Sequence, residues 1–278
     1  MANDRDPRSD LGAYLGEELR RARLDARIDS QELLARELGF DRTVIVKAET
    51  GSTPPSRDVA SKIAARFPEL CNGLYVSLAE IARKSNGPIP GWFTDWLTRE
   101  REATSIRIWQ PLIIPGLLQT ADYARALYIG GRASMSDEAL DELVTARLAR
   151  QAIFDKPDPP YLWVVLDESV LHRLMGTPKV TYDQLAHLAD MSERSYISVQ
   201  VVPASVGAHA GLACAFMVGS LDSEPDLLLI EAVEDQTLRD TDVVRKAAVA
   251  FDLVRGDALP RRASQDLILK VAEERWNV

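Results

Sequence analysis

Apolar residues recur every three or four positions through the first third of the chain, which is the period of helices that bury one face. Good helix-capping and turn-forming residues separate the periodic segments. The pattern predicts five short helices that share one small core across residues 11–83. The predicted helices begin at Leu11, Ser30, Asp41, Ser56 and Leu70.

The pattern changes beyond the turn-rich segment 84–91, which contains the sequence SNGPIPG and is predicted to be a linker. Short apolar runs of strand length then alternate with helical periods, which is typical of an α+β domain with a small mixed sheet. This domain is predicted over residues 92–278, whereas the polar, charged residues 1–10 are predicted to be disordered.

The predicted strands of this larger domain are residues 106–108, 112–114, 161–166, 197–202, 213–218 and 227–230. The predicted helices are residues 92–102, 115–127, 136–154, 169–175, 182–194, 242–254 and 264–276.

Residues 30–51 are predicted to form a helix, a tight turn and a second helix that lies in the major groove of DNA. Ser30 is a good N-cap, and Gly39 provides the left-handed residue that ends the first helix. Leu33, Leu34 and Leu38 fit a buried stripe on this helix. The second helix is capped by Asp41 and directs Ile45 into the core, which leaves an outward face of Arg42, Thr43, Val46 and Lys47. The alternative is a plain helical hairpin whose glycine is only a C-cap.

The distribution of charge limits how this segment would bind DNA. The whole chain has a net charge of −9, but residues 11–67 contain 10 basic and 9 acidic residues. A nearly neutral head joined to an acidic body favours selective, salt-sensitive binding through a few local cations. Arg57 and Lys62 are candidates for phosphate contacts. The first helix contains four further arginines, Arg20, Arg21, Arg23 and Arg27. They either contact phosphate or form a solvent-exposed polar face whose charge is balanced by Glu17, Glu18 and Asp25.

The rest of the sequence offers little catalytic or metal-binding chemistry. None of the three histidines, His172, His187 and His209, has metal-ligand spacing, and no phosphate-binding glycine motif is present. Asp167 and Glu168 follow a predicted strand and more simply cap the next helix than act as an acid–base pair. We therefore expect neither an enzyme nor a bound metal or cofactor.

Two cysteines far apart in sequence, Cys71 and Cys214, favour a reduced, cytoplasmic protein. The charged first residues do not resemble a signal peptide, and no apolar run is long enough to cross a membrane. An aromatic cluster of Trp92, Trp96 and Trp109 suggests either a small-molecule pocket or, more simply, part of the core between domains.

The head resembles the Xre-type (lambda repressor-like) helix-turn-helix family. The residues that carry this resemblance are Gln31, Ala35, Gly39, Ile45, Glu49 and Gly51. The body is similar to the C-terminal domain of unknown function found in the WhiJ-like, antitoxin-like regulators of streptomycetes. That similarity rests on PGLLQTADY at 115–123, VVPASVGAHAG at 201–211 and the last helix, which ends near Trp276.

The resemblance implies an actinobacterial transcription regulator that is a homodimer and binds double-stranded DNA at a near-palindromic operator. It also implies a possible small partner protein encoded by a neighbouring gene, and it assigns DNA contacts to Gln31, Arg42, Thr43 and Lys47. Asp29 and Asp41 place negative charge near the DNA backbone, and Val46 stands where a thymine methyl group is a suitable partner.

Our leading hypothesis is a sequence-specific regulator whose C-terminal domain dimerises and binds a partner protein or ligand. The alternatives are an antitoxin-like protein-binding module that uses DNA only for autoregulation, and a regulator that senses a small molecule. The candidate DNA-binding residues are Ser30, Gln31, Asp41, Arg42, Thr43, Val46, Lys47, Thr50 and Arg57.

Overall fold

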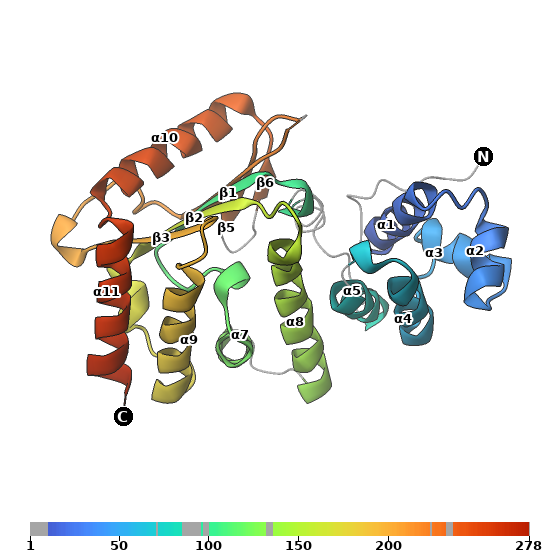
Figure 1. Ribbon diagram of the computed structural model, residues 1–278, viewed down its shortest axis with the longest axis horizontal. Helices are drawn as coiled ribbons and strands as arrows, with labels where there is room; N and C mark the ends of the chain where they lie inside the picture. The colour runs from blue at the N-terminus through green and yellow to red at the C-terminus, as the bar shows by residue number, and fades with distance from the viewer. Residues whose placement is uncertain are drawn as a thin grey trace. The chain divides into compact units, whose positions relative to one another are not determined.

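The computed structural model describes residues 11–70, 72–84, 96, 100–131, 136–222, 224–231 and 236–277 (Figure 1). The predicted disordered residues 1–10 lie outside these ranges, as does the predicted linker except for its first residue, Lys84. The chain forms two compact units. The first comprises Met1–Asp95 with Met135–Ala152, and the second comprises Trp96–Ser134 with Ile153–Val278.

The first unit contains the predicted five-helix head. Its helices are α1 (Leu11–Asp25), α2 (Gln31–Leu38), α3 (Arg42–Glu49), α4 (Arg57–Arg66) and α5 (Asn72–Lys84), with a short 3₁₀ turn, η1 (Pro68–Leu70), between the last two. Leu15, Leu19, Leu34, Ile45 and Ile63 are all fully buried, so the periodic apolar residues form one core. Helix α1 packs directly against α3.

A sixth helix, α8 (Asp137–Ala149), packs against α5 and completes the first unit. It lies within the predicted helix 136–154. Ser136 caps it by accepting a hydrogen bond from the backbone N–H of Ala139 (3.3 Å), and the 3₁₀ segment η3 (Arg150–Asp155) follows. The predicted body, residues 92–278, therefore contributes one acidic helix to the unit that contains the head.

The second unit is built on a six-stranded mixed sheet with the strand order β3-β2-β1-β4-β5-β6. The strands are β1 (Ser105–Gln110), β2 (Tyr161–Asp167), β3 (Ile197–Val202), β4 (Ala215–Ser220), β5 (Leu227–Glu231) and β6 (Gln236–Leu238). Strands β1, β2 and β3 are parallel, and each of β4, β5 and β6 pairs antiparallel with its neighbour. The predicted fold class, a helical head followed by a larger α+β domain, is confirmed.

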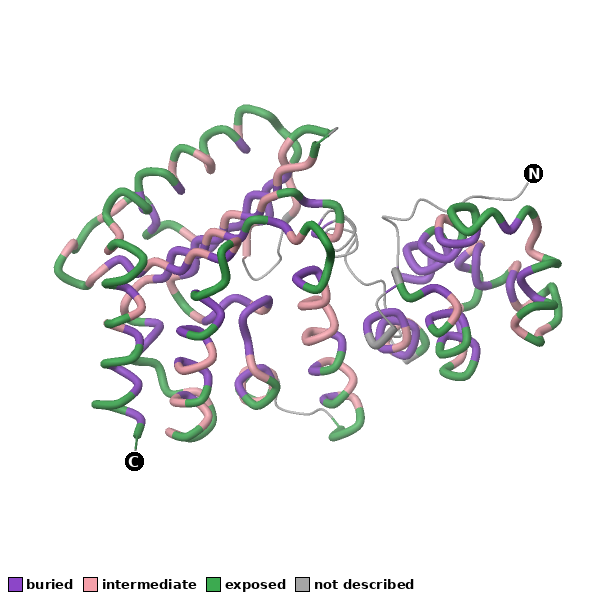
Figure 2. Tube along the Cα trace, viewed as in Figure 1, coloured by how far each residue is buried: buried purple, intermediate pink, exposed green. Residues whose placement is uncertain are grey.

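Helices cover both faces of this sheet (Figure 1). One face carries α7 (Ala121–Gly131), α9 (Pro178–Met191) and α11 (Arg261–Val271), which continues as a π-helical turn (Ala272–Trp276). The other face carries α10 (Thr241–Asp257), which packs Val244, Phe251 and Val254 against Trp109, Val165 and Phe216. The interior of the sheet is buried, whereas the outer side of α10 is exposed (Figure 2).

Three predicted elements differ in the structure. Residues 112–114 form no strand, since prolines flank them on both sides and proline cannot donate a backbone hydrogen bond. The predicted helix 115–127 is divided into the 3₁₀ turn η2 (Gly116–Leu118) and α7, because the side chain of Gln184 accepts from Thr120 N (2.7 Å) between them. The predicted helix 169–175 is only the 3₁₀ segment η4 (Glu168–His172).

Candidate DNA-binding surface

The predicted helix-turn-helix is formed by α2, a turn at Gly39 and α3. The Ser30 side chain caps α2 by accepting a hydrogen bond from Leu33 N (3.2 Å). Gly39 has a φ of 75°, and the next residue, Phe40, donates its backbone N–H to Ala35 O (2.9 Å). This left-handed turn favours glycine because a side chain would clash with the backbone. The local geometry follows the sequence prediction.

The predicted apolar stripe of α2 needs one correction. Leu34 is fully buried and Leu38 is half-buried, but Leu33 is 49% exposed. A helix of only eight residues turns one face to its core. Leu34, Ala35 and Leu38 lie on that face, and Leu33 points away from it.

Asp41 caps α3 and is held by Thr43. The Asp41 carboxylate accepts hydrogen bonds from the Thr43 hydroxyl (2.6 Å) and from Thr43 N (2.8 Å). These two bonds, the hydroxyl first, lower the pKa of Asp41, so the cap is ionised at neutral pH. The Thr43 hydroxyl therefore already donates its proton to Asp41. To donate to a DNA phosphate, the hydroxyl has to break this hydrogen bond.

Arg42 and Lys47 are the available cations of α3. Both side chains are exposed, and neither forms an ion pair with any residue that the structure describes. Val46 is half-buried between them. Thr50, at the end of the helix, donates its hydroxyl to Val46 O (2.8 Å), which ties it to the helix backbone.

Behind this surface lies a buried polar network centred on Glu49. Arg23 of α1 donates to both carboxylate oxygens of Glu49, from Nε (2.6 Å) and from Nη2 (3.2 Å). Arg23 Nη1 also donates to Ile28 O (2.8 Å), and the Gln31 amide donates to Glu49 Oε2 (2.8 Å). The network fixes the start of α2 to the end of α3 and to α1.

This network corrects one interpretation from the sequence and adds a contact to a second. The sequence pattern places Arg23 on the polar face of the first helix, but it is 7% exposed and paired with Glu49. The DNA contact that the family resemblance predicts for Gln31 stays a prediction, and the structure shows the Gln31 amide bound to Glu49. The missed signal is helical spacing: Arg23 follows buried Leu19 by four residues, and Glu49 follows Ile45 by four, so both share the buried face.

Several other basic residues of the head contact an acidic or an aromatic side chain. Arg20 and Arg21 form ion pairs with Glu17 (3.9 Å) and Glu18 (3.0 Å), as in the interpretation of a balanced polar face. Lys62 lies 4.4 Å from the centre of the Phe40 ring. The last member of the predicted DNA-binding set, Arg57, begins α4 and forms an ion pair with Glu80 of α5 (3.2 Å).

The aromatic residues proposed for a ligand pocket are packed where the structure describes them. Trp96 is buried and donates to Glu100 (2.8 Å). Trp109 is fully buried and donates its indole N–H to Gly211 O (2.7 Å), with the His209 ring edge-on at 5.2 Å. Trp92 lies outside the described residues.

The two carboxylates that follow β2 each accept a hydrogen bond from a backbone N–H. Asp167 caps η4 through Ser169 N (2.9 Å), as predicted, and Glu168 accepts from Ala204 N (2.7 Å). Among the described residues, His, Cys, Asp and Glu side chains form no group of three suited to a metal ion. No helix in the described part of the chain is long and apolar enough to cross a membrane.

Comparison with protein families agrees with this geometry. A family model described as "Helix-turn-helix" matches residues 19–69, which include α2, the turn and α3. A second model, described as "Domain of unknown function (DUF5753)", matches residues 93–270. No curated protein and no solved structure matches the chain. The predicted order of an Xre-like helix-turn-helix and this C-terminal domain is thus confirmed, and the chain belongs to the DUF5753 family, with the helix-turn-helix domain of a DNA-binding regulator at its N-terminal end.

Proposed function

We propose that the protein is a sequence-specific transcription regulator that places α3 in the major groove. Arg42 and Lys47 contact bases or phosphates, and Val46 packs against a thymine methyl group. The C-terminal domain makes the protein a homodimer and receives a signal from a small partner protein or a ligand. The chain has no proposed catalytic role.

The observation that carries this proposal is the exposure of two cations on α3 that form no ion pair with a described residue, whereas Arg20, Arg21 and Arg57 of the head do. An unpaired cation does not have to break an internal ion pair before it contacts DNA. Because the head is nearly neutral, these few residues supply much of the attraction to phosphate. Binding that depends on few cations gains its selectivity from base contacts.

The test is to map the DNA that the intact chain binds across the genome of its source cells. We expect enriched near-palindromic sites whose half-sites are centred about one helical turn apart, roughly 34 Å, or a multiple of it. A site upstream of the protein's own gene is expected for an autoregulator and identifies the neighbouring gene. If the bound DNA fragments share no enriched sequence, the result contradicts sequence-specific binding.

An aromatic surface on the sheet supports a second proposed function, the binding of a small partner protein in the manner of an antitoxin. Tyr161 is 58% exposed and stacks on Trp163, with ring centres 5.8 Å apart and planes at 16°. The guanidinium of Arg107 lies 5.9 Å from the Trp163 ring. Exposed aromatic rings beside arginine are enriched at protein interfaces, so this surface is a suitable place for the partner.

Affinity purification from native cells tests this second function. We expect a small protein to co-purify in stoichiometric amount after DNase treatment and to be lost when Tyr161 is replaced by alanine. Tyr182→Ala is the matched control, because Tyr182 is a tyrosine of α9, on the opposite face of the sheet. No partner, or a partner that Tyr161→Ala retains, contradicts binding at this surface.

A further inference from the structure

Helix α8 belongs to the DUF5753 segment by sequence and to the unit of the head by packing. Its first two turns contain Asp137, Glu138, Asp141 and Glu142. Its buried residues, among them Leu140 and Val144, lie on the remaining side. The family domain thus places an acidic helix against α5 within the DNA-binding unit.

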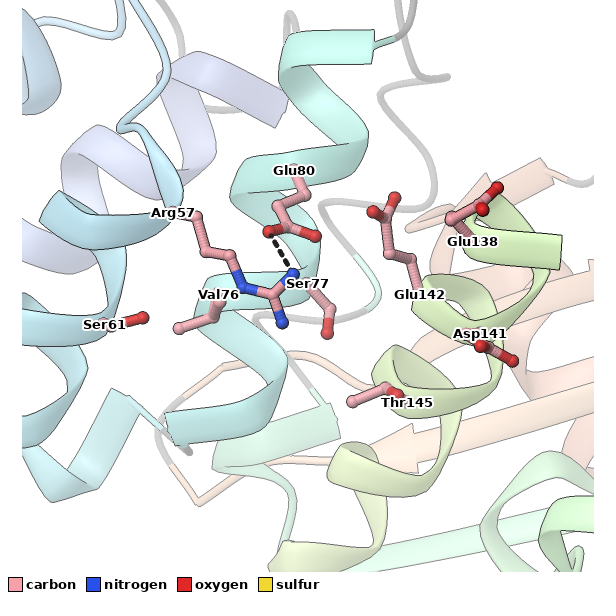
Figure 3. Close-up of a pocket in the computed structure, with 9 residues that line it drawn as sticks. All are labelled: Arg57, Ser61, Val76, Ser77, Glu80, Glu138, Asp141, Glu142 and Thr145. Atoms are coloured by element: carbon pink, nitrogen blue, oxygen red, sulfur yellow. Dashed lines mark ion pairs between the residues drawn. The ribbon is translucent and has the colours of Figure 1, made fainter. Parts of the chain in front are cut away.

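A cavity of about 570 Å³ lies among α4, α5 and α8 (Figure 3). The residues that line it are Arg57, Ser61, Val76, Ser77, Glu80, Glu138, Asp141, Glu142 and Thr145. Four of these are carboxylates and only one is a cation. Figure 3 shows the Glu142 side chain of α8 extending toward α5, and the Arg57 guanidinium beside Glu80 of α5.

Arg57 connects this cavity to the candidate DNA-binding surface. It is the first residue of α4, and the segment that precedes it leads directly from the end of α3. Its Nη1 lies 3.2 Å from Glu80 Oε1, and its side chain is 76% exposed while that of Glu80 is 11% exposed. An ion pair with one exposed partner is weak and is exchanged readily for another anion. Arg57 is therefore able to move from Glu80 to a DNA phosphate.

We propose that the acidic side of α8, together with Glu80, competes with DNA for Arg57. The carboxylates retain the guanidinium at the cavity when DNA is absent, and they oppose its transfer to phosphate when DNA approaches. The DUF5753 segment thereby lowers the DNA affinity of the head through charge, and any signal that moves or neutralises α8 raises it. This inference rests on the proposed DNA binding.

A double-mutant cycle between α8 and Arg57 tests the competition. The α8 variant is E138Q/D141N/E142Q, which keeps side-chain size and removes three charges. Binding of the intact chain to a mixed-sequence duplex at low salt is measured, since phosphate contacts do not depend on sequence. We expect about three- to tenfold tighter binding than wild type, the scale of a few screened charge pairs. In an Arg57→Ala background the same triple change should alter the dissociation constant less than about twofold.

A control separates this competition from general repulsion between acidic residues and DNA. The variant E17Q/D25N/E37Q removes three charges from the same unit at positions that do not line the cavity. We expect its effect on binding to be the same in the wild-type and the Arg57→Ala backgrounds. If the α8 triple variant unfolds, Glu80→Gln replaces it, because it removes the ion-pair partner alone and should also tighten binding only when Arg57 is present.

The outcomes are distinct. No tightening, or tightening that is equal in both backgrounds, overturns the role of α8 and leaves DNA binding intact. Absence of any salt-sensitive binding by the wild-type chain overturns the proposed function, and the competition with it. Tightening that requires Arg57 supports the competition.

Discussion

Replacing Glu49 by alanine is expected to lower the free energy of unfolding of the first unit by about 3–5 kcal/mol. The substitution leaves the guanidinium of Arg23 buried without its carboxylate, and the Gln31 amide loses its acceptor. Isolated charges are costly to bury because water no longer solvates them. The loss is large beside the roughly 5–15 kcal/mol by which domains are usually stable.

Urea denaturation of the intact chain measures this effect with an internal reference. Four of the five tryptophans, Trp96, Trp109, Trp163 and Trp276, lie in the second unit, so tryptophan fluorescence mainly follows that unit. Far-UV circular dichroism also follows the helices of the first unit. We expect Glu49→Ala to shift a helical transition to lower urea and to leave the fluorescence transition in place.

The double variant R23M/E49L is the matched control. An apolar pair of similar size in place of a buried ion pair is often neutral or stabilising, so its stability should return to within about 1 kcal/mol of wild type. If the double variant is as unstable as Glu49→Ala, the loss comes from packing and the charge argument is wrong.

The head is predictable from sequence because its structure is specified by local chemistry. Ser30, Gly39 and Asp41 act through hydrogen bonds and backbone angles that involve residues within five positions in the chain. Such signals are visible as residue types at fixed spacing. The buried stripe of α1, from Leu11 to Leu19, follows from periodicity alone.

The second unit is less predictable wherever a long-range contact decides the structure. The predicted helix 115–127 is interrupted because Gln184, more than sixty residues away, accepts a hydrogen bond from Thr120. Strand β6 escapes prediction, since three residues at an edge carry too little pattern to be recognised. The packing of α8 on α5 joins segments far apart in the chain, and periodicity does not show which partner a helix selects.

The sequence predicts which residues of the candidate site are exposed on α3, but it does not predict which charged residues pair with each other. The position of Arg42 and Lys47 on α3 follows from helix geometry. The pairing of Arg23 with Glu49 and of Arg57 with Glu80 depends on which helices cross, which a single sequence does not specify. Counting arginines therefore overstates the number of cations that are ready to contact DNA.

Replacing Arg42 and Lys47 together by alanine is expected to weaken operator binding by about 2 kcal/mol or more, roughly 30-fold, if each residue makes one base-reading contact. Neither side chain has an ion-pair partner among the described residues, so their loss should leave the fold unchanged. Fluorescence anisotropy with a labelled operator, at several salt concentrations, provides the measurement. A cation that also neutralises phosphate makes binding more sensitive to salt, so the slope of affinity against salt should become shallower in the double variant.

The matched control removes the same two residue types from α11 of the second unit, as R262A/K270A. Both side chains are exposed, and this variant has the same net charge as the double variant of α3. If general electrostatic attraction drives binding, the two variants should lose similar amounts of operator affinity. If α3 recognises the operator, only R42A/K47A should lose affinity. Full operator affinity of R42A/K47A at moderate salt would show that α3 is not the recognition helix, because no base contact could then depend on its exposed cations.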